Sequence, residues 1–434
     1  MTRPPQGDSA PDVRCVAGRD ALDRLAQDLD RLNAASTRPD PFSTADYLRA
    51  YVDRSEYFPD GMDVRLFVLT DGHEVVGIVP MRSVTDRFPA GLRSRRLEFL
   101  ATHDNERPHI ICRAGDEDRI ARAFVDHVAA HRGWSLVELR GQPVGSPLWR
   151  AAHAASGARR QVRDVPIGAY SEVALHHGDL VQYYAGLSKR MRSNISRQGR
   201  RLFRAGDVEL LIATGPDACS ALFDEYLELE DASWKFRSDA SVRRHPQRVA
   251  FFREVAAGRA GSDPSLVAIC LDGVMVAALL SAHHGKGMWA LEMAYDELHS
   301  DLGPGQLLLL VATGLALERN HRFFNFLQNY GYYKQRWQAD SIDVVNVQLL
   351  RRPGLHHVKG LVGDWRRRHV TGDDVPRPPM LTNDDRHAAV RRNAEHPSRA
   401  GAASRLAGAI ERAGPGVHLL RGAAATGHLP FSVG

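Results

Sequence analysis

The sequence predicts an α/β fold of the α+β kind, with two related lobes that each contain a mixed, mainly antiparallel sheet flanked by helices. Two segments have the pattern of a strand, an Asp-Gly turn and a strand, which is the strongest short-range signal of a hairpin. The same order of elements follows both segments, about two hundred residues apart. At 434 residues, with 43% hydrophobic and 25% charged residues, the chain is long enough for two globular units.

The first hairpin is predicted over residues 64–69 and 74–84, and the second over 266–271 and 274–283, because β-branched apolar runs meet at each turn. Each is followed by a third strand, a helix and a further strand. The first set of these is expected at 97–100, 117–131 and 135–140, and the second at 288–295, 304–318 and 322–328.

A helix over residues 179–204 is predicted to join the lobes. Leu187, Met191, Ile195 and Leu202 fall on one face of it. The opposite face is cationic and carries Lys189, Arg190, Arg197, Arg200, Arg201 and Arg204, with Arg192 at its edge. This face is either a solvated surface or a contact for a polyanion. Nucleic acid is therefore a possible partner only through Lys189–Arg204.

The expected organisation is a disordered leader over 1–17, an N-terminal lobe over 18–165, a C-terminal lobe over 166–370, and a linker with a weakly ordered tail over 371–434. Since the chain has no run of eighteen apolar residues, we expect no transmembrane segment. Its four cysteines lie far apart and form no CxxC pair, which is typical of reduced thiols in a cytoplasmic protein. No histidines have ligand-like spacing, so no metal is predicted.

The loop 302–305, Leu-Gly-Pro-Gly, precedes a helix whose first turns are nearly all leucine. Glycines let a ligand approach the backbone closely, and the free N–H groups of a helix start favour phosphate. The alternative is an ordinary turn.

A hairpin, a third strand, a glycine loop, a buried helix and another strand resemble the core of the GNAT acyltransferases. The resemblance implies tandem GNAT-like lobes, with acyl-CoA bound as co-substrate at the loop of the C-terminal lobe. Gly303 and Gly305 match the family's diphosphate loop, and Ser300 stands at its Gln or Arg position. The implied cofactor-binding residues are Ser300, Leu302, Gly303, Gly305 and Gln306.

Two further motifs are similar to those of the cellulose-biosynthesis-associated (CelD/BcsL-type) GNAT proteins. The first is the run from Glu230 to Lys235, which contains Asp231, Ser233 and Trp234. The second is Phe324-Asn325-Phe326-Leu327 followed by Tyr332, Tyr333, Lys334 and Trp337, with Asn325 where Asp is usual. The resemblance implies that Glu230, Trp234, Lys235, Asn325, Lys334 and Trp337 bind the substrate. Fem-type aminoacyl transferases share the two-lobed plan.

Three residues are candidates for proton transfer. Glu292 lies in the middle of a predicted strand, where partial burial would raise its pKa, and an outward-facing glutamate is the alternative. Asp231 is a second candidate base or orients the acceptor, and Tyr333 is a candidate to protonate the leaving thiolate, beside an ordinary surface role.

The predicted function is acyl-CoA-dependent N-acyl transfer, with acetyl as the expected acyl group, to an amine of a small or cell-envelope, polysaccharide-related acceptor. The acceptor is thus a small molecule, a glycan or a peptide. The alternatives are a tRNA-dependent aminoacyl transferase of Fem type and a catalytically degenerate binding module.

Overall fold

The computed structural model describes residues 10–54, 63–101, 107–157, 159–237, 240–328, 336–352, 354–356, 402–413 and 417–421. It divides the chain into two compact units. The first unit comprises residues 1–52, 57–169 and 342–374, and the second comprises 53–56, 170–341 and 375–434. In the described part of the chain, every helix is too short or too polar to cross a lipid bilayer.

The first unit has a sheet of order β1-β2-β3-β4-β6-β13-β7. Its strands are β1 Asp12–Ala17, β2 Asp63–Asp71, β3 Glu74–Arg87, β4 Arg93–Phe99, β5 Ile111–Cys112 (paired with β3), β6 Leu136–Pro143, β13 Asp340–Arg351 and the first part of β7 Arg160–Ala174. Its helices are α1 Asp20–Arg24, α2 Ala26–Ala34, η1 Pro41–Ser43, α3 Ala45–Arg54, η2 Pro89–Gly91, α4 Glu117–Ala130 and α5 Pro147–Ala154. The buried face of α4, with Ile120 and Phe124, packs in the core of this unit.

The second unit has a sheet of order β7-β12-β11-β10-β9-β8-β14. Besides the end of β7, its strands are β8 Val208–Thr214, β9 Asp263–Leu271, β10 Val274–His284, β11 Gly287–Tyr295, β12 Phe323–Gln328 and β14 Val417–Arg421. Its helices are α6 Leu180–Gly186, α7 Lys189–Ala205, α8 Pro216–Asp231, α9 Trp234–Arg237, α10 Pro246–Ala256, η3 Glu297–Leu302, α11 Pro304–Glu318 and α15 Ala402–Ala413.

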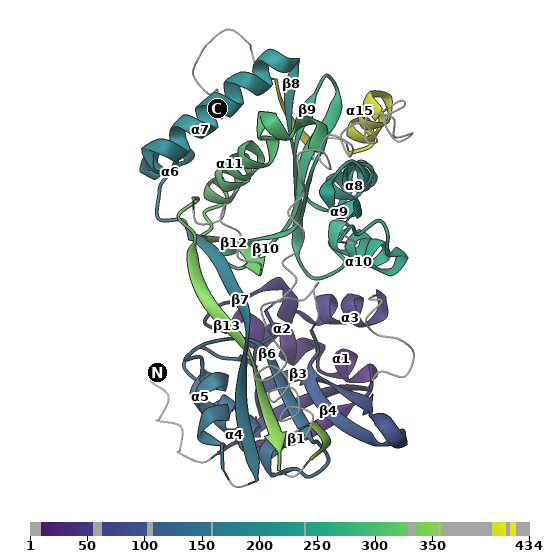
Figure 1. Ribbon diagram of the computed structural model, residues 1–434, viewed down its shortest axis with the longest axis vertical. Coiled ribbons are helices and arrows are strands. Elements are labelled where there is room, and N and C mark those ends of the chain that lie inside the picture. The colour runs from purple at the N-terminus through teal and green to yellow at the C-terminus, as the bar shows by residue number, and fades with distance from the viewer. Residues whose placement is uncertain are drawn as a thin grey trace, which may run out of the picture. The chain divides into compact units, whose positions relative to one another are not determined.

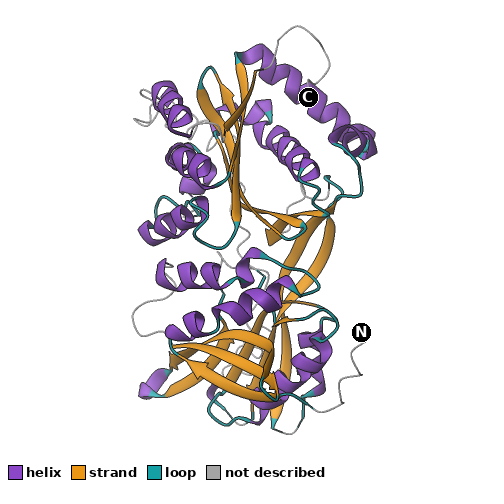
Figure 2. Cartoon of the chain, turned by 180° about the vertical axis from the view of Figure 1, so that it is seen from behind, coloured by secondary structure: helices purple, strands orange, loops and turns teal. Residues whose placement is uncertain are grey.

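The helices of the second unit cover both faces of its sheet. Helix α11 lies on one face with α7 on its outer side, while α8, α10 and α15 lie on the other face (Figure 1). Figure 2 shows the same layers from behind. Helix α11 is apolar nearly all round and is buried from Leu307 to Leu317, since it packs between the sheet and α7. Its start is thus held between rigid elements.

The predicted duplication is confirmed. Strands β2 and β3, and β9 and β10, form antiparallel hairpins at the two Asp-Gly turns. In each unit the third strand is antiparallel to the hairpin, and the strand after the helix is parallel to the third one: β6 pairs with β4, and β12 with β11. The two units therefore repeat one topology.

The single helix expected over 179–204 is instead two helices, α6 and α7. The break occurs at Leu187 and Ser188, where Ser188 caps α7: its Oγ accepts the N–H of Met191 at 3.2 Å. A capping serine favours the start of a new helix, and the periodic apolar pattern does not show this break. The apolar face prediction is confirmed, because Leu187, Met191, Ile195 and Leu202 are all buried.

Three segments of the chain pack in places that the predicted domain boundaries do not assign to them. Strand β1 lies within the segment expected to be a leader and pairs with β2. Strand β13 follows the second unit in sequence but pairs with β6 of the first. In the tail, α15 contacts α8, and β14 pairs with β8. Pairings over such distances leave no local pattern in the sequence.

Candidate functional site

Strands β11 and β12 pair only at one end. Their parallel register runs from Gly287 opposite Phe323 to Trp289 opposite Asn325. Beyond this point β11 continues to Tyr295, while β12 bends: Leu327 has a φ of 57°, and the register with β7 shifts between Asn325 and Gln328. The two strands therefore separate, and no described strand pairs with this edge of β11 after Trp289.

A β-bulge in β11 lies at the point of separation. Leu280 of β10 is opposite Glu292, whereas the next residue, Ser281, is opposite Ala290, so Leu291 is an extra residue in β11. Bulges bend a strand and redirect its side chains. This one is directly next to Glu292.

Glu230, at the end of α8, is completely buried and is the centre of a polar network. Its Oε1 accepts hydrogen bonds from the hydroxyl of Tyr226 at 2.9 Å and from Lys235 Nζ at 3.3 Å. Its Oε2 accepts hydrogen bonds from Ser241 Oγ at 2.9 Å and from the backbone N–H of Arg243 at 3.2 Å. Burial of a carboxylate is unfavourable unless its oxygens accept hydrogen bonds, and these four donors supply them.

Lys235 joins this network to β11, because its ammonium group also forms an ion pair with Glu292. Arg248, on α10, donates from Nη2 to the other oxygen of Glu292 at 2.9 Å. Burial alone would lower the pKa of Lys235, but the two carboxylates reverse this effect and raise it. Burial raises the pKa of Glu292, although the charges of Lys235 and Arg248 oppose the shift. Glu292 is therefore a largely buried carboxylate, 11% exposed, whose pKa lies above its ordinary value.

The other residues of the Glu230–Lys235 motif point elsewhere. Asp231 is buried and forms an ion pair with Arg243 Nε at 3.1 Å. Trp234 is 41% exposed. The backbone O of Ala232 accepts the N–H of Glu297 at 3.2 Å, which links the motif to the segment that follows β11.

The predicted phosphate loop lies beneath α7. Gly303, with a φ of 65°, precedes α11, and its N–H donates to the carbonyl of Ser300 at 3.2 Å. The amide of Gln198 lies where a Cβ on Gly303 would be, at 2.1 Å from that position. Asn194 Nδ2 donates to Gln306 Oε1 at 2.8 Å. Two amide side chains of α7 therefore cover the start of α11, which the sequence did not predict.

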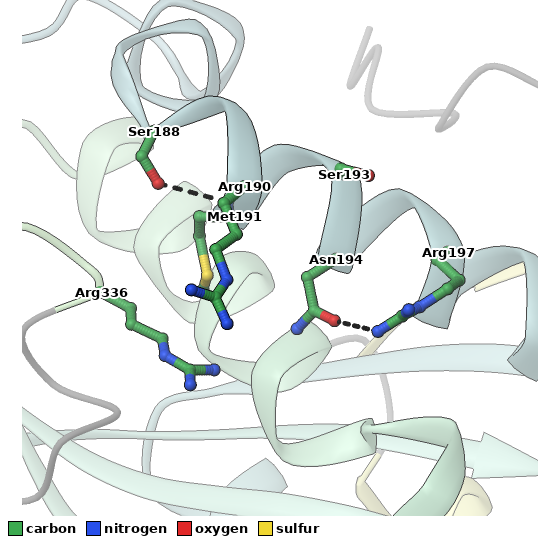
Figure 3. A pocket seen from close by; sticks show the side chains of 7 residues that line it. All are labelled: Ser188, Arg190, Met191, Ser193, Asn194, Arg197 and Arg336. Atoms are coloured by element: carbon green, nitrogen blue, oxygen red, sulfur yellow. Dashed lines mark hydrogen bonds between the residues drawn. The ribbon is translucent and has the colours of Figure 1, made fainter.

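Next to this contact is a cavity of about 470 Å³ that Asn194 also lines. The remaining lining residues are Ser188, Arg190, Met191, Ser193 and Arg197 of α7, and Arg336 (Figure 3). Arg197 Nη2 donates to Asn194 Oδ1 at 2.7 Å. The cavity thus combines three guanidinium groups with neutral polar groups.

The structure brings some predicted site residues together and separates others. Lys235 contacts both Glu230 and Glu292. The loop residues Ser300, Leu302, Gly303, Gly305 and Gln306 lie at the start of α11. Asn325 is buried and donates to Glu172 Oε2 at 2.7 Å. Trp337 is a core residue whose carbonyl accepts the hydroxyl of Tyr183 at 2.9 Å. Tyr333 and Lys334 are outside the described residues.

Sequence reasoning missed Tyr226, Ser241 and Arg248. Tyr226 precedes Glu230 by one helical turn, a spacing that could have identified it. Ser241 and Arg248 reach the network only through tertiary packing, and no local pattern marks them.

Residues 189–335, about a third of the chain, match the family model described as an acetyltransferase (GNAT) domain. This segment extends from the start of α7 past the end of β12 and includes Glu230, Glu292 and the loop before α11. The chain therefore carries a GNAT acetyltransferase domain and is an acyltransferase. No curated protein matches the sequence.

Several solved structures are similar to the chain. FemX is 10% identical, with 78% of this chain and 98% of that chain covered and a TM-score of 0.43. The C-terminal domain of a putative lysylphosphatidylglycerol synthetase from Agrobacterium fabrum is 11% identical, with 80% and 97% covered and a TM-score of 0.48. A tandem GNAT protein from the clavulanic acid biosynthesis pathway is 15% identical, with 78% and 98% covered and a TM-score of 0.45.

Proposed function

We propose that the chain is an acyl-CoA-dependent N-acyltransferase, with acetyl as the first acyl group to test and an amine as the acceptor. The observation that carries the proposal is the separation of β11 from β12 beside the largely buried carboxylate of Glu292, within the GNAT domain. Backbone groups at a separated strand edge are available to a pantetheine chain, and the carboxylate is next to the same edge. The narrower resemblance to the cellulose-biosynthesis-associated proteins supports a glycan or cell-envelope acceptor.

Some of the backbone groups at the start of α11 are available to bind a diphosphate, and others are covered by α7. Among the described residues, the N–H of Gly305 donates to no acceptor, and it lies at the positive end of the helix dipole. Gln198 covers Gly303, so that residue's contribution is to let α7 approach closely. In the proposed site Ser300, Leu302, Gly305 and Gln306 form the wall of the diphosphate site and Gly303 its floor.

In the proposed reaction the amine nitrogen attacks the thioester carbonyl, a C–N bond forms and the C–S bond breaks. Glu292 accepts the proton that the nitrogen loses, and the thiolate of CoA leaves with a proton from a nearby donor, for which Tyr333 remains the candidate. Lys235 and Arg248 hold the carboxylate of Glu292 in place. Glu230, Trp234 and Lys235 remain our candidates to position the acceptor, and so do Asn325, Lys334 and Trp337, although the burial of Asn325 and Trp337 favours a structural role.

Glu292→Gln tests the role of the carboxylate. We expect the rate of acetyl transfer from acetyl-CoA to a panel of amines to fall by about 10²- to 10⁴-fold, since a positioned base contributes this much. The wild-type rate should increase with pH through the raised pKa of Glu292, and this step should vanish in the variant.

The control is Glu318→Gln at the exposed end of α11, which should leave the rate unchanged. Circular dichroism and thermal melting of both variants separate a loss of chemistry from a loss of folding. Full activity of a folded Glu292→Gln protein would place the base elsewhere. No turnover of any acyl-CoA by the wild-type chain would overturn the proposed function itself.

The exposed cationic face of α7 favours one alternative, a tRNA-dependent aminoacyl transferase. Lys189, Arg190, Arg197, Arg200 and Arg204 are all exposed, as a polyanion contact requires. Under this alternative, affinity for aminoacyl-tRNA should fall steeply with added salt. Tight binding of CoA that tRNA does not change would exclude it.

A further inference from the structure

The start of α7 contradicts a rule of helix electrostatics. The first turn of this 17-residue helix contains Lys189 and Arg190 and no acidic residue. Cations at a helix start face the positive end of the dipole, which costs stability, whereas anions there are favourable. Local conflicts of this kind are typical of functional sites.

The cavity described above opens at this helix start. Ser188, Arg190, Met191, Ser193, Asn194 and Arg197 of α7 line one side, and Arg336 approaches from the segment after β12. Figure 3 shows the guanidinium groups of Arg190 and Arg336 turned toward the same space. No carboxylate is among the described residues that line the cavity, and Arg190 has no hydrogen-bond or ion-pair partner within the described part of the chain. The described lining of the cavity therefore carries positive charge from three arginines.

A lining of this kind suits an anion with several charges. Guanidinium groups match the geometry of phosphate oxygens, and the hydroxyls of Ser188 and Ser193 and the amide of Asn194 add donors. A volume of about 470 Å³ is in the range of small-molecule sites, so the space accommodates a phosphate together with the molecule that carries it.

We propose that this cavity is a phosphate-recognition site, which binds a phosphate ester or diphosphate group through Arg190, Arg197 and Arg336. The proposal does not depend on acyl transfer. The phosphate has two possible sources, a CoA thioester or a phosphorylated acceptor.

The first experiment uses inorganic pyrophosphate as the probe, with the full chain, in calorimetry and thermal melting. Wild-type protein should bind pyrophosphate and melt at a higher temperature in its presence, because the ligand binds only the folded state. Arg190→Gln and Arg336→Gln should each weaken binding by about tenfold or more, since each removes a charge-assisted contact. Arg204→Gln, an exposed residue at the far end of α7, is the matched control and should bind like the wild type.

The melting temperature without ligand shows whether Arg190 binds a ligand or only stabilises the fold. Removing a cation from the first turn of α7 relieves its repulsion with the helix dipole. The unliganded Arg190→Gln protein should therefore melt at the wild-type temperature or higher, while losing most of the increase caused by pyrophosphate. A lower melting temperature without ligand, together with unchanged pyrophosphate binding, would overturn the proposal, and so would absence of pyrophosphate binding to the wild type.

A second experiment identifies the source of the phosphate. If it is the co-substrate, Arg190→Gln should weaken binding of CoA but not of pantetheine, which has no phosphate. If it is the acceptor, the variant should raise the KM of a phosphorylated amine, with glucosamine 6-phosphate as the probe, and leave CoA binding unchanged. Either result supports the site. Binding of tRNA without any binding of pyrophosphate would replace it with a polynucleotide surface. The proposed function is tested separately. If the wild type and Arg190→Gln both acylate unphosphorylated amines while neither binds pyrophosphate, the acyltransferase function holds and the phosphate site does not.

Discussion

The contact between α7 and the start of α11 depends on one residue without a side chain. Gly303 has a left-handed φ of 65°, and a Cβ there would lie 2.1 Å from the Gln198 amide. The backbone conformation therefore favours glycine, and a side chain there would also displace the amide end of Gln198. Gly303 therefore has a role in the packing of α7 against α11, besides the ligand role inferred from the motif.

Gly303→Ala should lower the free energy of unfolding by more than the cost of a left-handed alanine, about 1–2 kcal/mol, because the methyl group also meets Gln198. Gly72→Ala is the matched control: its φ is 58°, and no atom lies within 4 Å of the added Cβ. Urea unfolding of both variants measures the difference. Adding Gln198→Ala to Gly303→Ala should reduce the loss to the Gly72→Ala level, and failure of this rescue would contradict the contact.

A second residue-scale effect concerns buried His283. Its Nδ1 lies 2.8 Å from His321 Nε2, and its Nε2 lies 2.7 Å from Ser265 Oγ. Burial lowers the pKa of His283 to about 2. Below pH 6.5 the unfolded chain binds a proton that the folded chain rejects, so stability is lost as pH falls from 6.5.

The expected loss from His283 is about 2 kcal/mol between pH 6.5 and pH 5, at about 1.4 kcal/mol per pH unit. Urea unfolding at a series of pH values measures it. His283→Gln should reduce this dependence and leave the part due to His321, whose pKa burial lowers to about 4. His73→Gln, at an exposed turn, should leave the dependence unchanged. An equally steep dependence in His283→Gln would show that the acid sensitivity has another origin.

At the scale of elements, one lysine connects α8, α9 and β11. Lys235 lies between the completely buried carboxylate of Glu230 and the largely buried carboxylate of Glu292. Removing one partner of a buried ion pair leaves an uncompensated charge, which costs more than the pair contributes. The junction between these elements therefore depends on the lysine charge.

Lys235→Met should lower the free energy of unfolding by about 3–5 kcal/mol at pH 7. The deficit relative to the wild type should shrink as the pH is lowered to 5, because burial raises the pKa of Glu292 and its protonation removes an uncompensated negative charge. Lys189→Met, at an exposed position on α7, should change stability by no more than about 0.5 kcal/mol. A deficit that does not change with pH would indicate lost packing instead of lost charge.

Elements with strong local signals could be predicted from the sequence. The Asp-Gly hairpins and the leucine-rich α11 follow from turn chemistry and continuous hydrophobicity, and their bounds agree within a few residues. Burial of Asn325 and Trp337 could not be predicted, because it arises from packing against Glu172 and Tyr183, each about 150 residues away in sequence. The contact of Arg248 with Glu292 was likewise invisible, since it joins α10 to β11.

At the scale of the whole molecule, the end of the chain is part of the second unit. Helix α15 contacts α8 and buries Leu406 and Ala409, and β14 pairs with β8 at the edge of the sheet. The alanine-rich and glycine-rich composition suggested only a weakly ordered tail. The contact joins α15 to α8, two helices far apart in sequence. Amino-acid composition cannot predict a contact of this kind.

Leu406→Ala should lower the free energy of unfolding by about 2–5 kcal/mol, since the leucine is almost completely buried. Glu411→Ala, at an exposed position on the same helix, is the control and should have little effect. Chemical denaturation of both proteins measures the change. A Leu406→Ala protein as stable as the control would mean that α15 does not dock on α8 in solution.

The position of β13 in the first unit has a consequence for synthesis on the ribosome. The edge of β6 that β13 covers stays unpaired until residue 351 has left the ribosome. Synthesis proceeds at about 5–20 residues per second, so roughly ten to forty seconds separate the synthesis of β6 from that of β13. During that interval the N-terminal half presents an open strand edge to every other nascent chain nearby, and chaperone binding over this period would protect it from pairing with the wrong neighbour.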